Sequence, residues 1–146
     1  MTDESIIKRT DELMKELEFN GTDINDYLKD NPDSFIEINL KEFWNEMIEK
    51  SGMSKYDIIN KSDYSYNYFY EVIGGKRIPS ADKVLRLALA LHLELEDCQK
   101  ALRYCGYAPL YPRIKRDSII IYAINNNYSV FQTIDLLNKS GEKNLK

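Results

Sequence analysis

The chain has 146 residues, of which 43% are hydrophobic and 30% are charged, and its formal net charge is −4. This length is sufficient for one core of ordinary size, and a second domain is not required. No stretch approaches about 18 uninterrupted apolar residues, which excludes a membrane-spanning helix. The acidic start of the sequence lacks a secretory signal pattern, so we expect a cytoplasmic protein.

Charge is distributed unevenly along the chain. Residues 1–53 contain fourteen Asp and Glu against six Lys and Arg, a net charge of −8. Residues 54–146 contain ten against fourteen, a net charge of +4. This asymmetry is compatible with a DNA-binding body that carries an acidic arm, and equally with an interaction protein whose acidic arm is solvated.

Two short amphipathic helices are predicted in residues 1–38, the acidic N-terminal arm. The first is capped by Thr2 or Asp3 and stops at Asn20-Gly21, and the second opens at Thr22-Asp23 and ends at Asn31-Pro32. Because an apolar stripe needs only an apolar surface to cover it, we expect both helices to pack on the body. Dimerisation or docking of a partner is the alternative. The stripe of the first helix consists of Ile6, Thr10, Leu13, Met14 and Leu17.

Five helices are predicted between residues 39 and 106. Asn39 caps the first, which ends at Ser51-Gly52. Ser54 caps the second, which runs to Lys61, and Ser65 caps the third, from Tyr66 to Ile73. Gly74-Gly75 ends the third helix, because the left-handed cap conformation requires no Cβ there. Ser80 caps the fourth, and the fifth covers about Leu95 to Tyr104.

Residues 40–102 resemble the Xre or lambda-repressor-like helix-turn-helix family. The string GKRIPS, Gly75–Ser80, resembles the family's link from its recognition helix into its fourth helix, and it is the most specific part of the resemblance. The recognition helix would then be residues 65–73. The resemblance implies an all-α core, residues 39–106, that binds double-stranded DNA as a homodimer and regulates transcription.

Three positions near the turn differ from the family's pattern. Ile59 stands where the family has a small Ala that lets two helices cross closely, and Ser62 stands where it has Leu. Asp63 replaces the Gly of the turn, although Asp tolerates left-handed backbone less readily than Gly does.

The resemblance also implies which side chains would meet DNA. Ser54 and Lys55 would hold a phosphate together with the backbone amides at the start of their helix. Asn67 would pair with adenine and Glu71 with cytosine in the major groove. Lys76 and Arg77 would bind the DNA backbone where the chain leaves the helix. The full set is Ser54, Lys55, Ser65, Tyr66, Asn67, Tyr70, Glu71, Lys76 and Arg77.

The same stretch supports a second hypothesis, in which the surface binds a protein partner. No basic residue occurs from Tyr66 to Gly75, and tyrosine recurs at positions 64, 66, 68 and 70. Tyrosine is enriched at protein interfaces, because it brings contact area and a hydroxyl at low entropy cost. Tyr64 and Tyr68 are expected to belong partly to the core.

A helical hairpin is predicted in residues 107–146, as one compact unit with the core. Pro112 can take the first position of a helix to about Asn126, and Ser129 caps another that runs to Lys139. When residues 111–145 are aligned with residues 76–110, five positions are identical. This pattern favours a two-copy αα-hairpin repeat, stacked into a short superhelix whose concave face suits a protein partner. Chance similarity between two hairpins is the alternative.

A basic cluster, Arg113, Lys115 and Arg116, lies at the start of that hairpin. Positive charge is unfavourable at a helix N-terminus. We therefore consider a secondary contact with DNA phosphate, with the acidic arm or with an acidic partner. A solvated turn, with Asp117 paired locally to Arg113, is the alternative.

No combination of residues predicts catalysis, a cofactor or a metal site. His92 is the one histidine, and it ends an apolar helix. Cys98 and Cys105 lie seven residues apart on one predicted helix, a rise of roughly 10 Å, which is too far for a disulfide. A zinc site would need a further ligand at suitable spacing. We expect reduced, partly buried cysteines in a non-enzymatic protein.

Overall fold

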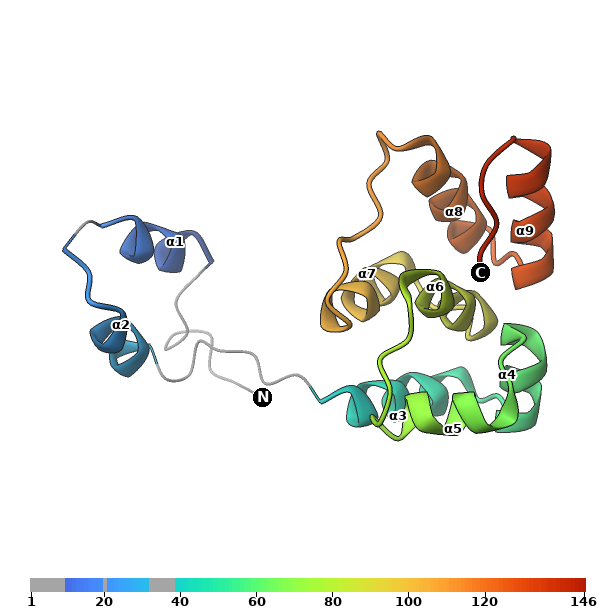
Figure 1. The fold of residues 1–146 in the computed structure, drawn as a ribbon, viewed down its shortest axis with the longest axis horizontal. Coiled ribbons are helices and arrows are strands. Elements are labelled where there is room, and N and C mark those ends of the chain that lie inside the picture. The colour runs from blue at the N-terminus through green and yellow to red at the C-terminus, as the bar shows by residue number, and fades with distance from the viewer. Residues whose placement is uncertain (1–9, 20, 32–38) are drawn as a thin grey trace. The chain divides into compact units, whose positions relative to one another are not determined.

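The computed structural model describes residues 10–19, 21–31 and 39–146, and all of the regular structure in these ranges is helical, in nine helices (Figure 1). The prediction of an all-α fold is confirmed. The chain divides into two units, residues 1–38 and residues 39–146, which we call the arm and the body.

The arm contains α1 (Thr10–Glu18) and α2 (Ile24–Asp30). The carboxylate of Asp23 caps α2 by accepting hydrogen bonds from two backbone amides of its first turn. Met14 and Leu17, from the predicted apolar stripe, are about half exposed. The predicted helix start at Thr2 or Asp3, and the stripe residue Ile6, lie outside the described residues.

The body begins with three helices, α3 (Leu40–Ser51), α4 (Lys55–Ser62) and α5 (Tyr66–Ile73). Each is preceded by the expected cap, since the side chains of Asn39, Ser54 and Ser65 accept a hydrogen bond from the third backbone amide that follows. The helix α3 packs on α5, and Trp44 of α3 is completely buried.

The centre of the body is α6 (Ala81–Ala90), which packs on α4, α7 (Leu95–Tyr104) and α9 (Val130–Lys139). Every residue from Val84 to Ala90 is buried. A helix that is apolar on all sides has to be surrounded, and Arg86 is the one polar side chain in this buried stretch.

The C-terminal hairpin consists of α8 (Lys115–Asn125) and α9. The prediction that α8 starts at Pro112 is wrong, because residues 111–114 form a turn. The backbone N–H of Tyr111 donates to the carboxylate of Asp117 at 3.0 Å, and the N–H of Ile114 donates to the carbonyl of Tyr111 at 3.0 Å. These bonds hold Pro112 outside the helix.

The internal repeat is present in the backbone as well as in the sequence. At an offset of thirty-five residues, His92 and Asn127 both adopt left-handed backbone, with φ of 52° and 56°. Gly106 and Gly141 do so at the ends of the two hairpins, with φ of 91° and 73°. The equivalent hydrogen bonds also form, so the two hairpins end their helices in the same way.

The two hairpins close on each other and do not form an open stack. The helix α6 packs on α9, and α7 packs on α8. Asp117 of the second hairpin accepts from the N–H of Tyr111, and its equivalent Asp82 accepts from the N–H of Lys146. Tyr111 and Lys146 are also thirty-five residues apart. The aspartate of each hairpin therefore binds the residue that follows the other hairpin, as in an approximate two-fold arrangement. The expected superhelix with a concave face is wrong, and the chain end lies against α6 and α8 (Figure 1).

Both cysteines are buried and form no disulfide. Burial raises the pKa of the Cys98 thiol to about 12 and that of Cys105 to about 11. We expect iodoacetamide at pH 8 to alkylate both at least about 100-fold more slowly in the folded chain than in urea, because only the thiolate reacts. Mass spectrometry of timed samples measures the two rates. Equal rates with and without urea would contradict the burial.

Candidate nucleic-acid interface

The helix α5 is held in position by α3 and by a tight turn at its C-terminal end. The side-chain amide of Asn45 donates to the carbonyl of Ile73 at 3.0 Å. Gly75 has a φ of 75°, and a Cβ built there would lie 3.3 Å from the Cβ of Lys41. The N–H of Lys76 then donates to the carbonyl of Glu71 at 2.9 Å, which fixes the direction in which the chain leaves α5.

Two faces of α5 differ sharply in character. Phe69, Val72 and Ile73 are buried. Tyr66, Asn67 and Tyr70 face outward, with Tyr66 65% exposed and Tyr70 38% exposed. The rings of Tyr66 and Tyr70 lie against each other, with their centroids 4.7 Å apart. These three outward side chains are uncharged, and Glu71, the residue after Tyr70, adds one half-exposed carboxylate to the helix.

The start of α4 lies beside this outward face. The Nζ of Lys55 sits 5.8 Å from the centre of the Tyr70 ring, a cation–π contact. The hydroxyls of Ser54 and Ser65 accept hydrogen bonds within their own helices, from the N–H of Asp57 at 3.1 Å and of Tyr68 at 3.3 Å. Both serines thus act first as helix caps.

Glu71 and Arg77 are bonded to each other. The Nε of Arg77 donates to the Glu71 carboxylate at 2.6 Å, and the Arg77 guanidinium lies 5.6 Å from the centre of the Tyr68 ring. Glu71, expected to accept from cytosine, instead positions Arg77 in this conformation. Since both side chains are about half exposed, the pair is weak enough to open when a ligand competes.

The nine residues predicted to meet DNA are therefore gathered around one surface. The contacts of Lys55 with Tyr70, of Tyr66 with Tyr70 and of Glu71 with Arg77 link the start of α4, the outward face of α5 and its exit. We call this the α5 surface. Lys76, also exposed, lies beside Arg77 at the exit.

Tyr64 and Tyr68 are the two tyrosines expected in part to belong to the core. Tyr64 is buried, and its hydroxyl donates to the carbonyl of Lys83. Burial raises the pKa of the Tyr64 hydroxyl, which keeps it a neutral donor. Tyr68 is half buried against Tyr64, and the Nζ of Lys83 lies 4.9 Å from its ring centre.

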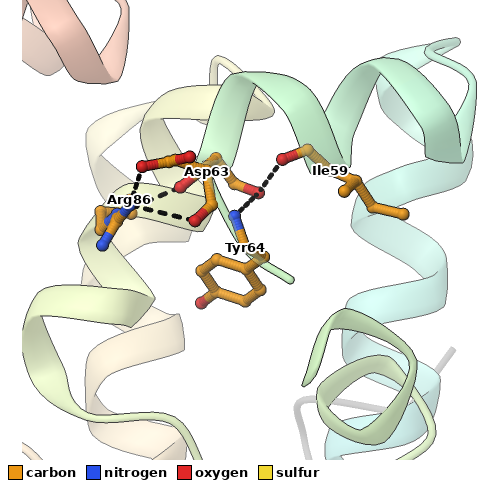
Figure 2. Close-up of polar contacts among 5 residues, drawn as sticks. Ile59, Asp63, Tyr64 and Arg86 are labelled. Carbon is orange, nitrogen blue, oxygen red and sulfur yellow. Dashed lines mark hydrogen bonds and ion pairs between the residues drawn. The ribbon is translucent and has the colours of Figure 1, made fainter. Parts of the chain in front are cut away.

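The turn between α4 and α5 is held by Arg86, which the sequence analysis did not identify (Figure 2). Asp63 has a φ of 58°, as the family's Gly would allow. The guanidinium of Arg86 donates to the carbonyls of Ser62 and Asp63, both at 3.1 Å, and to the Asp63 carboxylate at 3.0 Å. An arginine within an otherwise apolar helix must find acceptors, and this signal was present in the sequence.

The other two departures from the family pattern are accommodated at the same turn. The hydroxyl of the buried Ser62 donates to the carbonyl of Ile59 at 3.2 Å and accepts from the N–H of Tyr64 at 3.4 Å. The side chain of Ile59 points away from Arg86 and packs, half buried, against the core (Figure 2). A polar network thus replaces the Leu and Gly of the family pattern.

The basic cluster at the start of α8 mainly serves the fold. Arg116 donates to the carbonyls of Lys143 and Asn144 and pairs with Asp82 at 3.1 Å. Lys115 pairs with Glu142 at 3.7 Å. Both residues fasten the last segment of the chain, so the expected secondary contact rests on the exposed Arg113. Asp117, whose local pairing with Arg113 was the alternative, accepts from the Tyr111 N–H.

Across the ranges that the structure describes, no helix is long and apolar enough to cross a membrane. Within those same ranges, no group of three or more His, Cys, Asp and Glu side chains could hold a metal ion. Comparison with known proteins gives no matching family model, no similar curated protein and no similar solved structure.

Proposed function

We propose that the body is a DNA-binding module of the Xre or lambda-repressor-like type, which regulates transcription in the cytoplasm by placing α5 in the major groove. The observation that carries this proposal is the arrangement of charge around α5. The uncharged side chains of Tyr66, Asn67 and Tyr70 lie between Lys55 at the start of α4 and Lys76 and Arg77 at the exit from α5. The one carboxylate of α5, that of Glu71, is paired with Arg77. Base edges call for polar uncharged groups, and phosphates on either side call for cations.

The dimensions of α5 agree with this role. Its eight residues span about 12 Å, similar to the width of the major groove. Asn67 on its first turn can form the bidentate pair with adenine, and the hydroxyls of Tyr66 and Tyr70 can reach phosphates or base edges. The capped start of α4 adds backbone amides beside Lys55, which suit a phosphate.

Salt dependence of binding tests the proposal. The cations that we expect to contact phosphate are Lys55, Lys61, Lys76 and Arg77, so the logarithm of affinity should fall with the logarithm of salt concentration at a slope of about −3 to −4 per chain. Fluorescence anisotropy of the full chain, on a duplex selected from a random pool, measures the slope. Failure to select any duplex, or a slope near zero, would contradict DNA binding through this surface.

Protein binding by the same surface is the second candidate. It is favoured by the exposed, mutually stacked Tyr66 and Tyr70 and by the absence of a basic residue on α5 itself. The two functions separate by mutation. Under protein binding, Tyr66→Ala with Tyr70→Ala breaks a complex that Lys76→Glu with Arg77→Glu leaves intact, and DNA is not retained by either form.

A further inference from the structure

A long uncharged segment runs through the C-terminal hairpin. Residues 118–134 contain no Asp, Glu, Lys, Arg or His, although 30% of the chain is charged. Several of these residues are nevertheless exposed. Tyr122 of α8 is 52% exposed and Phe131 of α9 is 56% exposed. The ring of Tyr122 contacts that of Tyr128, with centroids 5.7 Å apart, so these two rings form one aromatic surface, and Phe131 follows Tyr128 by three residues.

The internal repeat shows how the equivalent surface of the first hairpin is used. Tyr122 and Asn125 correspond to Leu87 and Ala90 of α6, both of which are buried. The helix α8 packs on α7 and α9, as α6 packs on α9 and α7, but α6 is also covered by α4. The α8 positions equivalent to the covered α6 positions are exposed. Helix α6 thus has a third main packing partner, α4, whereas α8 has two.

Phe131 adds a second, independent difference between the hairpins. Its equivalent in the first hairpin is Glu96, an exposed residue that pairs with Lys100 one turn later. A position that carries charge in one copy therefore carries an exposed aromatic ring in the other. Interface centres are poor in charged residues and rich in Tyr and Phe, which is the composition found here.

We propose that this surface, comprising Ile121, Tyr122, Asn125, Tyr128 and Phe131, is the contact between two copies of the chain. In this arrangement α8 packs on α8 of the second copy across a two-fold axis. A two-fold contact brings identical patches together, so a charged patch would repel itself, whereas an uncharged one does not. The absence of charge gives no complementarity to an acidic or a basic partner, and a second copy offers the covering helix.

The dimer does not depend on DNA binding, and it leaves the α5 surface free. The hairpin α8–α9 and the helix α5 lie on opposite sides of the body (Figure 1). Two copies joined through α8 would therefore present two α5 helices, and loss of DNA binding would not by itself disturb the dimer.

Sedimentation equilibrium of the full chain from about 1 to 100 μM tests the proposal. We expect twice the mass of the 17.1 kDa chain at the upper concentrations. Tyr122→Lys with Phe131→Lys is expected to weaken dimerisation at least about 100-fold, because four lysines would meet at the axis. Tyr56→Lys with Ile78→Lys makes the same kind of change at exposed positions elsewhere, and it should leave the dimer unaltered.

A cross-link locates the contact. Tyr122→Cys treated with a short bismaleimide should yield a covalent dimer, whereas the unmodified chain, whose two cysteines are buried, should not. Circular dichroism of each variant verifies that the fold is retained. A chain that is monomeric at 100 μM overturns the proposal. So does a dimer that survives Tyr122→Lys with Phe131→Lys, since the contact would then lie elsewhere.

Discussion

Replacing Lys76 and Arg77 by glutamate is expected to abolish DNA binding and to leave the fold intact. Both side chains are exposed at the exit from α5, and neither contributes to the core. Each change removes a charged contact to phosphate and introduces repulsion. Charge-assisted hydrogen bonds are worth about 1.5–3 kcal/mol each, so the double variant should bind about 1,000-fold more weakly or worse. Anisotropy at fixed salt measures the loss.

Two further variants make this result specific. Arg103→Glu with Lys143→Glu changes the net charge equally at exposed positions on α7 and near the chain end, and it should alter affinity by less than about 3-fold. Glu71→Gln should act in the opposite direction, because it removes a negative charge and releases Arg77 from its 2.6 Å bond. Equal losses of affinity in both double variants would mean that the net charge of the chain, and not the position of Lys76 and Arg77, determines binding. Undiminished binding by Lys76→Glu with Arg77→Glu would exclude the proposed contact with the DNA backbone.

Arg86→Met is expected to destabilise the body by about 2 kcal/mol. The substitution keeps an apolar stem in the core but leaves the carbonyl oxygens of Ser62 and Asp63 without their guanidinium donor. An unsatisfied buried polar group costs about 1–3 kcal/mol. The loss of the Asp63 ion pair adds less, because that carboxylate is largely exposed and can be solvated. Urea unfolding followed by circular dichroism measures the change.

The matched variants separate the turn network from a general effect of losing an arginine. Arg103→Met, at an exposed site on α7, should change the free energy of unfolding by less than about 0.5 kcal/mol. Asp63→Gly should be close to neutral, since glycine adopts the φ of 58° without strain while the carboxylate contact is lost. A double-mutant cycle between positions 63 and 86 gives the coupling. If Arg86→Met were as stable as the unmodified chain, the network would have no structural role.

Local signals in the sequence were sufficient to place most helices of the body. Ser54, Ser65, Ser80 and Ser129 each cap the helix that was predicted to follow them. A helix cap depends on residues three positions apart, so it can be predicted from the local sequence. The predicted helix start at Pro112 was wrong because proline is compatible both with the first turn of a helix and with a turn before it. The hydrogen bond from the Tyr111 N–H to Asp117 favours the turn.

Long-range contacts were not predictable in this way. The alignment of residues 76–110 with 111–145 indicated two similar hairpins, but not that they close crosswise through Asp82 and Lys146. The nine residues of the candidate site could be named from the resemblance to a family. The bond between Glu71 and Arg77, which changes the expected role of Glu71, depends on how the chain turns at Gly75. The acceptors of Arg86 could not be named from the sequence, because they lie more than twenty residues away.

The crosswise closure of the hairpins also bears on the order in which the body can fold during synthesis. Asp82 belongs to the central helix, yet it receives Arg116 and the amide of Lys146, sixty-four residues further along. The side chain of Leu145 is buried in the same core. A nascent chain that has not yet released these residues from the ribosome can form α3 to α7 but cannot cover one side of α6. Completion of the core thus waits for residue 146, whereas the α5 surface is assembled from residues made much earlier.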